Sequence, residues 1–252
     1  MSDLEFRNIE DRGEVKKNEG KSGFIVEKRL KRFKENKKNT EEQHKKDSEE
    51  ADGLLSNMMN NMDNEKFKNL EKKESLTDEE VQWMVDFANE KFGGELDCKI
   101  TNITDKQAEY LSKVNSLFLD SLTSITDKQA GILSKVNELS LYSLKKITDN
   151  QARELWNVSR LLLDWLTSIT DKQAEFLWKV KELSLDWLTS ITDKQAEYFW
   201  NVDNLYLYWL EKITEKQVLA LRDVKRLFLP RGLHNVEYDA EKQQYYYVPE
   251  KN

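Results

Sequence analysis

Ile169-Thr170-Asp171-Lys172-Gln173-Ala174 is a stretch that recurs along the chain at a fixed interval. Near-copies of it begin at Ile103, Ile125, Ile147, Ile191 and Ile213, so that successive copies are 22 residues apart. A fixed period of about 20 to 50 residues is the sequence signature of a solenoid, in which similar units stack in a row. The repeat therefore decides the fold before any other feature is considered.

Each unit predicts a short helix followed by a short strand. In the unit that starts at Ile169, Thr170 and Gln173 have the spacing of a capping box at the start of a helix. Leu183 and Leu185 alternate with variable residues, as in a strand with one buried face. Because one unit cannot bury its apolar side chains alone, we expect the units to stack into a parallel sheet, with the helices on the opposite, convex side.

The pattern from Leu183 to Asp193, Leu-x-Leu-x-x-Leu-x-x-Ile-Thr-Asp, resembles the leucine-rich repeat. It is most similar to the variant L-x-L-x-x-C-x-x-I-T-D, with leucine in place of the cysteine at Leu122, Leu144, Leu166, Leu188 and Leu210. The resemblance implies an α/β solenoid with a concave parallel sheet that binds proteins. It also implies that the side-chain ladder which that cysteine or an asparagine makes to the loop backbone is absent here.

We expect four parts in the chain. They are a charged, largely disordered or helical tail over residues 1–52, a helical region with an N-terminal cap over 53–102, six leucine-rich repeats over 103–234, and a C-terminal hairpin cap over 235–252. In the N-terminal cap, Thr77 and Glu80 form another capping box, Gly93-Gly94 ends the helix, and Cys98 is a small buried residue after a degenerate first strand.

A stripe of large apolar residues precedes this cap at helical spacing and continues to Phe67 and Leu70: Leu54, Leu55, Met58, Met59 and Met62. We expect the stripe to pack on the neighbouring domain, and its exposure would instead indicate self-association.

Composition limits the partners and the compartment. A net charge of −7 argues against general affinity for nucleic-acid phosphates, and the single cysteine, Cys98, leaves no intramolecular disulfide. The N-terminus lacks the apolar core of a signal peptide, and no run of about 18 apolar residues predicts a membrane span. We therefore expect a cytoplasmic protein. The alternative is export by a route that needs no signal peptide.

A basic segment interrupts the acidic chain near its start, at Lys28, Arg29, Lys31, Arg32, Lys34, Lys37 and Lys38. It predicts either an arm that binds an anionic membrane or nucleic acid, or a solvated run of charge balanced by the acids that follow it.

The variable strand positions predict the binding site, because they point away from the core in three columns across the concave face. Their aromatic and acidic members are our candidate partner-binding residues: Trp165, Trp187, Trp209, Asp164, Asp186, Tyr206, Tyr208, Phe118 and Tyr142. Exposed aromatic side chains are typical interface anchors, and the carboxylates favour a basic or polar protein or peptide over nucleic acid. Alternatively, the three indoles stack on one another and stabilise the sheet.

A second tryptophan row, Trp156, Trp178 and Trp200, falls at the helices. For this row we expect packing between neighbouring helices, with an exposed patch as the alternative.

We predict that the chain is not an enzyme and binds no cofactor. Its histidines are His44 and His234, and it contains no phosphate-binding glycine loop, nucleotide fingerprint or cysteine and histidine spacing for a metal. The expected function is a non-catalytic scaffold that recognises a protein or peptide. The alternatives are an adaptor tethered through the basic segment and a glycan-binding module.

Overall fold

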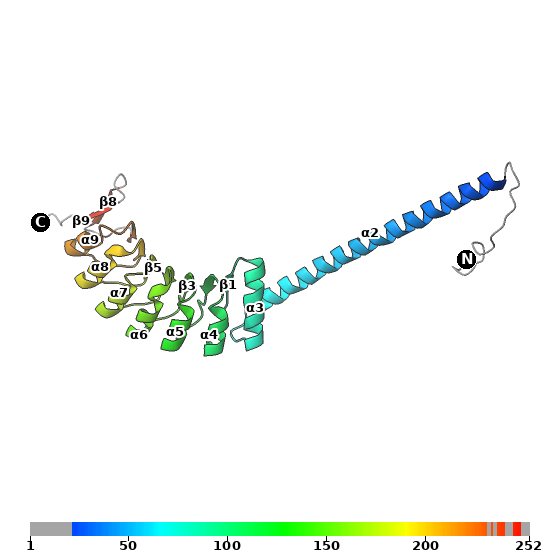
Figure 1. Cartoon of the computed structure of the whole chain (residues 1–252). Helices are drawn as coiled ribbons and strands as arrows, with labels where there is room; N and C mark the ends of the chain where they lie inside the picture. The colour runs from blue at the N-terminus through cyan, green and yellow to red at the C-terminus, as the bar shows by residue number, and fades with distance from the viewer. Residues whose placement is uncertain (1–21, 231–232, 234–235, 240–243, 248–252) are drawn as a thin grey trace. The chain divides into compact units, whose positions relative to one another are not determined.

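The computed structural model describes residues 22–230, 233, 236–239 and 244–247, and for most residues between 22 and 51 the description covers the backbone only. The chain forms two compact units, residues 1–63 and residues 64–252. The second unit contains the repeats (Figure 1).

Helix α2, Ser22–Leu70, contains all the described residues of the first unit. The apolar stripe of Leu54, Leu55, Met58, Met59 and Met62 is exposed, with each side chain between 58% and 69% accessible. The packing expected of the stripe is therefore wrong for these five residues and right for its continuation, Phe67 and Leu70. The next apolar residues of the helix, Phe67 and Leu70, belong to the second unit and are buried in its core. Among the described helices, none is both long and apolar enough to cross a membrane.

The second unit begins with an N-terminal cap. Thr77 caps helix α3, Asp78–Lys91, and forms the predicted capping box with Glu80. Gly93 and Gly94 then turn the chain with φ angles of 63° and 79°, a left-handed conformation that a side chain disfavours. Strand β1, Glu95–Asp97, follows, and Cys98 is buried as expected.

Six short helices follow, one in each repeat, and each begins after a threonine with a capping box. They span six or seven residues, which is about two turns. They are α4 Asp105–Leu111, α5 Asp127–Leu133, α6 Asp149–Glu154, α7 Asp171–Leu177, α8 Asp193–Tyr198 and α9 Glu215–Ala220, and the 3₁₀ turns η1 Leu155–Asn157 and η2 Phe199–Asn201 extend α6 and α8.

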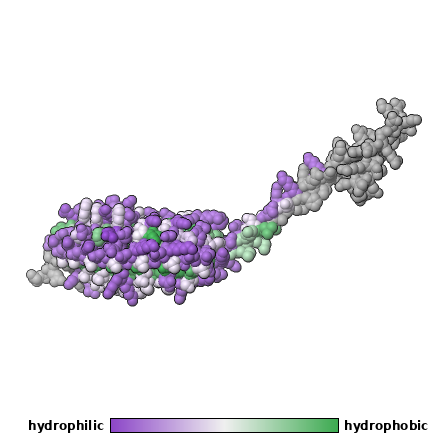
Figure 2. All heavy atoms as spheres, turned by 60° about the horizontal axis from the view of Figure 1, so that its bottom comes forward, coloured by the Kyte–Doolittle hydropathy of each residue, from purple (hydrophilic) through white to green (hydrophobic). Residues whose placement is uncertain are grey.

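Each repeat helix leads to a three-residue strand, and these strands join β1 in one parallel sheet of seven strands in sequence order. They are β2 Ser116–Phe118, β3 Glu138–Ser140, β4 Arg160–Leu162, β5 Glu182–Ser184, β6 Asn204–Tyr206 and β7 Arg226–Phe228. Figure 1 shows the repeat helices side by side along one face of this sheet. Figure 2 looks towards this helical side, where the surface is mostly hydrophilic.

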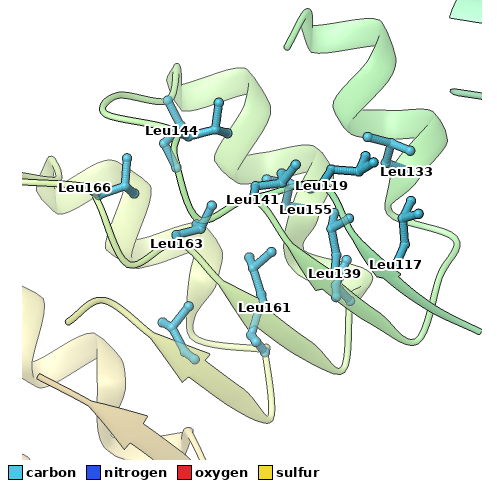
Figure 3. Packing of buried hydrophobic residues seen from close by; sticks show 14 of the residues in the cluster. Leu117, Leu119, Leu133, Leu139, Leu141, Leu144, Leu155, Leu161, Leu163 and Leu166 are labelled. Carbon is cyan, nitrogen blue, oxygen red and sulfur yellow. The ribbon is translucent and has the colours of Figure 1, made fainter. Parts of the chain in front are cut away.

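Leucines from strands and helices fill the space between the two layers (Figure 3). The first strand leucine of each of the first five repeats, such as Leu139 or Leu161, is fully buried and lies in register with its counterparts in neighbouring repeats, whereas Leu227 of the last repeat is partly buried. Leu144 and Leu166, at the cysteine position of the family pattern, are also fully buried. Stacked units of this kind constitute the expected α/β leucine-rich-repeat solenoid.

A glutamine ladder links neighbouring repeats. The capping-box amide of Gln173 accepts a hydrogen bond from the backbone N–H of Thr170, and its Nε2 donates to the Ile147 carbonyl of the preceding repeat at 2.9 Å. The same bond to the preceding unit, at 2.7 to 2.8 Å, is made by Gln129, Gln151, Gln195 and Gln217, and by Gln107 to the Leu76 carbonyl ahead of α3. These buried bonds hold successive repeats at one fixed step.

A two-stranded antiparallel hairpin, β8 Val236–Asp239 and β9 Gln244–Tyr247, follows the last repeat, as expected. Val236 and Tyr245 pack against the core, and the Tyr245 hydroxyl accepts a hydrogen bond from the backbone N–H of Leu229. The hairpin therefore contacts the end of the solenoid just after its last strand.

Candidate functional site

The sheet face opposite the helices carries four columns of side chains. Three of them are the columns expected from the sequence. The residue just before the first leucine of each strand also points away from the core. The strand register aligns these residues in one column: Glu95, Ser116, Glu138, Arg160, Glu182, Asn204 and Arg226. Their common spacing of 22 residues was the signal in the sequence that could have revealed them.

This additional column forms a charged ladder. Arg160 bridges Glu138 and Glu182 on the strands to either side, at 2.9 Å in each case. The ladder continues through Asn204, which donates to Glu182 and accepts from Arg226. The central charges of this column are therefore paired within the chain.

An aromatic row of Tyr142, Trp165, Trp187 and Trp209 crosses this face of the sheet. The rings of Tyr142 and Trp165 are 5.8 Å apart, those of Trp165 and Trp187 are 5.5 Å apart, and those of Trp187 and Trp209 are 5.3 Å apart. Exposure increases along the row, from the half-buried Trp165 to 39% for Trp187 and 60% for Trp209. The row therefore combines ring stacking with a large accessible aromatic surface.

A second aromatic group lies on the same face. Tyr206 stacks on Phe228, with ring centres 4.4 Å apart, and Tyr208 lies within 6.1 Å of both rings. Tyr208 is 46% exposed. Phe118 stands apart from this group, because Ser140, Leu162 and Ser184 separate it from Tyr206 in the same column.

The two candidate aspartates lie in less polar surroundings than a surface position would give them. Asp164 is only 8% exposed and accepts a hydrogen bond from the Ser184 hydroxyl. Burial raises its pKa above the ordinary value. Burial first, and the Asp164 charge second, raise the pKa of Asp186 to about 6.

Two buried polar atoms lack a hydrogen-bond partner in the described part of the chain. They are Oδ1 of Asp186 itself and Nε1 of Trp165, the residue that follows Asp164. Both belong to the step between β4 and β5, where the Trp187 backbone N–H donates to the Asp164 carbonyl at 2.9 Å. An unpaired buried polar atom costs about 1 to 3 kcal/mol. Within the described residues, the hydrogen-bonding groups of this step of the face are thus not all paired.

The second tryptophan row is only partly packed between helices: η1, which contains Trp156, contacts α5 and α7, and Trp178 is half-buried. Trp156 and Trp200 are 38% and 53% exposed. The Lys179 ammonium lies 4.2 Å from the ring centre of Trp156 and 5.6 Å from that of Trp178. The Lys179 ammonium therefore lies near the indoles of two neighbouring repeats.

The remaining sequence-based candidates can be placed only in part. The basic residues Lys28, Arg29, Lys31, Arg32 and Lys34 lie in α2, but their side chains are outside the described residues, as is His234. Burial raises the pKa of the Cys98 thiol to about 12, which leaves it uncharged near neutral pH. Within the described part of the chain, no three His, Cys, Asp or Glu side chains are grouped so that they could hold a metal ion.

No protein-family model matches the chain, and no curated protein does. Solved structures that it is similar to include internalin C2 from Listeria monocytogenes, at 19% identity and a TM-score of 0.41 over 60% of this chain and 74% of that one. The functional domain of InlJ from the same organism, which includes a cysteine ladder, shares 15% identity at a TM-score of 0.37, over 60% of this chain and 32% of that one. At these scores the fold assignment rests on the sheet and the repeats themselves.

Proposed function

We propose that the chain is a non-catalytic scaffold that recognises a protein or peptide through the concave face of its repeats. The observation that carries the proposal is the aromatic row, in which Trp187 and Trp209 remain exposed although their rings are held in place by stacking. Indoles held in this way lose little conformational entropy on binding and bury a large area, as interface anchors do.

The charges of the face indicate the kind of partner. Glu138 and Glu182 share an ion pair with Arg160, whereas Asp164 and Asp186 form no ion pair with any described lysine or arginine. The negative charge left on the face favours a basic or polar partner and repels phosphate. We retain the cytoplasm as the expected compartment of such a scaffold.

The test is affinity capture from a native lysate, followed by mass spectrometry. The wild-type chain is compared with Trp165→Ala/Trp187→Ala/Trp209→Ala, and circular dichroism checks that the variant is folded. The chain provides a matched control, Trp156→Ala/Trp178→Ala/Trp200→Ala, which removes three indoles from the other row. We expect a specific partner to be lost only with the concave variant.

Other results would redirect the proposal. A partner retained by the concave variant would make the aromatic row structural. Capture that is lost on deletion of residues 24–38 and weakened by salt would favour the adaptor function, and binding to a glycan array would favour sugar recognition.

A further inference from the structure

The step between β4 and β5 of the concave face contains two neighbouring carboxylates. Asp164 and Asp186 occupy the same column in consecutive repeats, and Ser184 donates a hydrogen bond to Asp164. The backbone N–H of Asp186 also donates a hydrogen bond to the Asp164 carboxylate, the backbone N–H of Tyr208 donates one to the Asp186 carboxylate, and the Ser184 hydroxyl lies within reach of the Asp186 carboxylate as well. These donors are all uncharged, so they reduce but do not cancel the repulsion between two adjacent negative charges.

What this step lacks is a positive charge with hydrogen-bond donors. Asp186 Oδ1 accepts no hydrogen bond from any described residue, and no described lysine or arginine forms an ion pair with either carboxylate. Lys145 is 6.0 Å from the ring centre of Trp165, so it approaches the aromatic row but not these carboxylates within ion-pair distance.

Another column of this face shows how the chain pairs carboxylates with a cation. Glu138 and Glu182, also on the outer face of the sheet, are bridged by the guanidinium of Arg160. Asp164 and Asp186 lie in consecutive repeats with no position between them, and the positions on either side in their column hold Tyr142 and Tyr208 rather than a cation. A guanidinium or ammonium group would therefore have to come from another molecule.

The tryptophans beside these carboxylates suit the same ligand chemistry. A basic side chain can place its methylene stem against Trp165 and Trp187 and its charged end at the carboxylates, because cations are attracted to indole rings and carboxylates together. A divalent metal ion fits less well, since no group of three ligating side chains occurs within the residues that the structure describes.

We infer that the Asp164 and Asp186 step of the concave face, with Trp165 and Trp187 beside it, is a subsite for a basic side chain, arginine or lysine, of the bound partner. This inference rests on the proposed function and locates the basic group of the partner within that face. Because Asp186 Oδ1 is shielded in the unbound chain, the flanking indoles shift when the basic group enters.

NMR spectroscopy of the full chain with ¹⁵N-labelled tryptophan tests the inference directly, because each of the seven tryptophans has its own indole N–H signal. Single Trp→Phe variants assign the signals. The probes are N-acetyl-arginine amide, N-acetyl-lysine amide and N-acetyl-citrulline amide, the last of which has nearly the shape of the arginine probe without its charge. We expect arginine or lysine amide to shift the signals of Trp165 and Trp187, and citrulline amide to leave them unchanged.

Asp186→Asn should weaken binding of the charged probe about tenfold or more, because hydrogen bonds to charged groups are the stronger kind. Glu175→Gln is the matched control, since it removes one negative charge from an exposed position on α7. Equal shifts with citrulline amide, shifts confined to the Trp156, Trp178 and Trp200 signals, unchanged signals with all probes, or full affinity in Asp186→Asn would each overturn the inference.

The partner-capture test of the proposed function and the NMR test of the subsite have distinguishable failures. If partner capture depends on the concave tryptophans but no basic probe shifts their signals, the subsite is wrong and the proposed function stands. If basic probes shift the signals but the captured partners do not depend on the concave tryptophans, the proposed function is wrong instead.

Discussion

Asp186 is a carboxylate that the fold holds where its negative charge is unfavourable. Its pKa is raised to about 6 from an ordinary value of 3.8, first by burial and then by Asp164. The unfolded chain therefore loses this proton near pH 3.8, whereas the folded chain retains it up to about pH 6. The resulting penalty is absent below pH 3.8, grows between these two values and is complete above pH 6.

Asp186→Asn should therefore stabilise the isolated chain at pH 7.5. The expected gain in the free energy of unfolding is on the order of 1 kcal/mol, reduced from the full shift because the carboxyl is partly screened by solvent. Urea denaturation at pH 7.5 and near pH 4 measures it, and the gain should disappear at the lower pH. An equal gain at both pH values would mean that the charge is not the cause.

Gly94 carries a second local constraint. Its φ of 79° disfavours any side chain, and a Cβ there would lie 3.0 Å from the Asn115 backbone nitrogen, whereas a Cβ at Gly93 would meet nothing within 4 Å. Gly94→Ala should therefore lower the free energy of unfolding more than Gly93→Ala. For Gly93→Ala the left-handed conformation alone costs about 1 to 2 kcal/mol. Thermal denaturation of both variants gives the comparison, and equal losses would show that the close approach is relieved by a small movement.

Among the elements, the repeat helices show how far the sequence could predict the fold. The spacing of Thr170 and Gln173 predicts the helix start correctly, because a capping box is a contact within four consecutive residues. The second bond of Gln173, to Ile147 of the preceding repeat, depends on how repeats stack, and no local pattern contains that information. The glutamine ladder therefore could not be predicted from the sequence of one repeat.

Removal of one glutamine of the ladder should lower the free energy of unfolding more than removal of one helix cap. Thr170→Ala loses mainly the cap, worth about 1 kcal/mol. Gln173→Ala loses the acceptor for Thr170 and also leaves the buried Ile147 carbonyl without its donor, for a total of about 2 to 4 kcal/mol. Chemical denaturation measures both, with Lys172→Ala as an exposed control. Equal costs for the two variants would show that the ladder adds nothing.

The candidate site was predictable only where the pattern was simple. Trp165, Trp187 and Trp209 recur every 22 residues, so their alignment on neighbouring strands followed from the repeat, and the structure brings their rings together. Their role in binding stays a prediction. The burial of Asp164 and the pairing of Arg160 could not be predicted, because both depend on the side chains of adjacent repeats rather than on the residue itself.

At the scale of the whole molecule, the division into two units predicts a truncation result. Deletion of residues 1–63 should leave the second unit folded with little change in its melting temperature, because Phe67 and Leu70 remain. Deletion of residues 1–71 should lower the melting temperature clearly, since burial of a phenylalanine alone is worth about 3 to 5 kcal/mol. Circular dichroism on heating measures both. A large loss in the shorter deletion would show that the first unit stabilises the repeats.

The glutamine rungs and the hydrogen bonds of the parallel sheet both connect one repeat to the next, so both run along the stacking direction. If the solenoid is pulled from its two ends, every interface between repeats carries the same force, and the interfaces break one at a time instead of all together. Optical tweezers should therefore record a series of small ruptures. Each should release 22 residues, roughly 70 to 80 Å of extended chain. Under tension the scaffold would lengthen by whole repeats and could recover its length by restacking them.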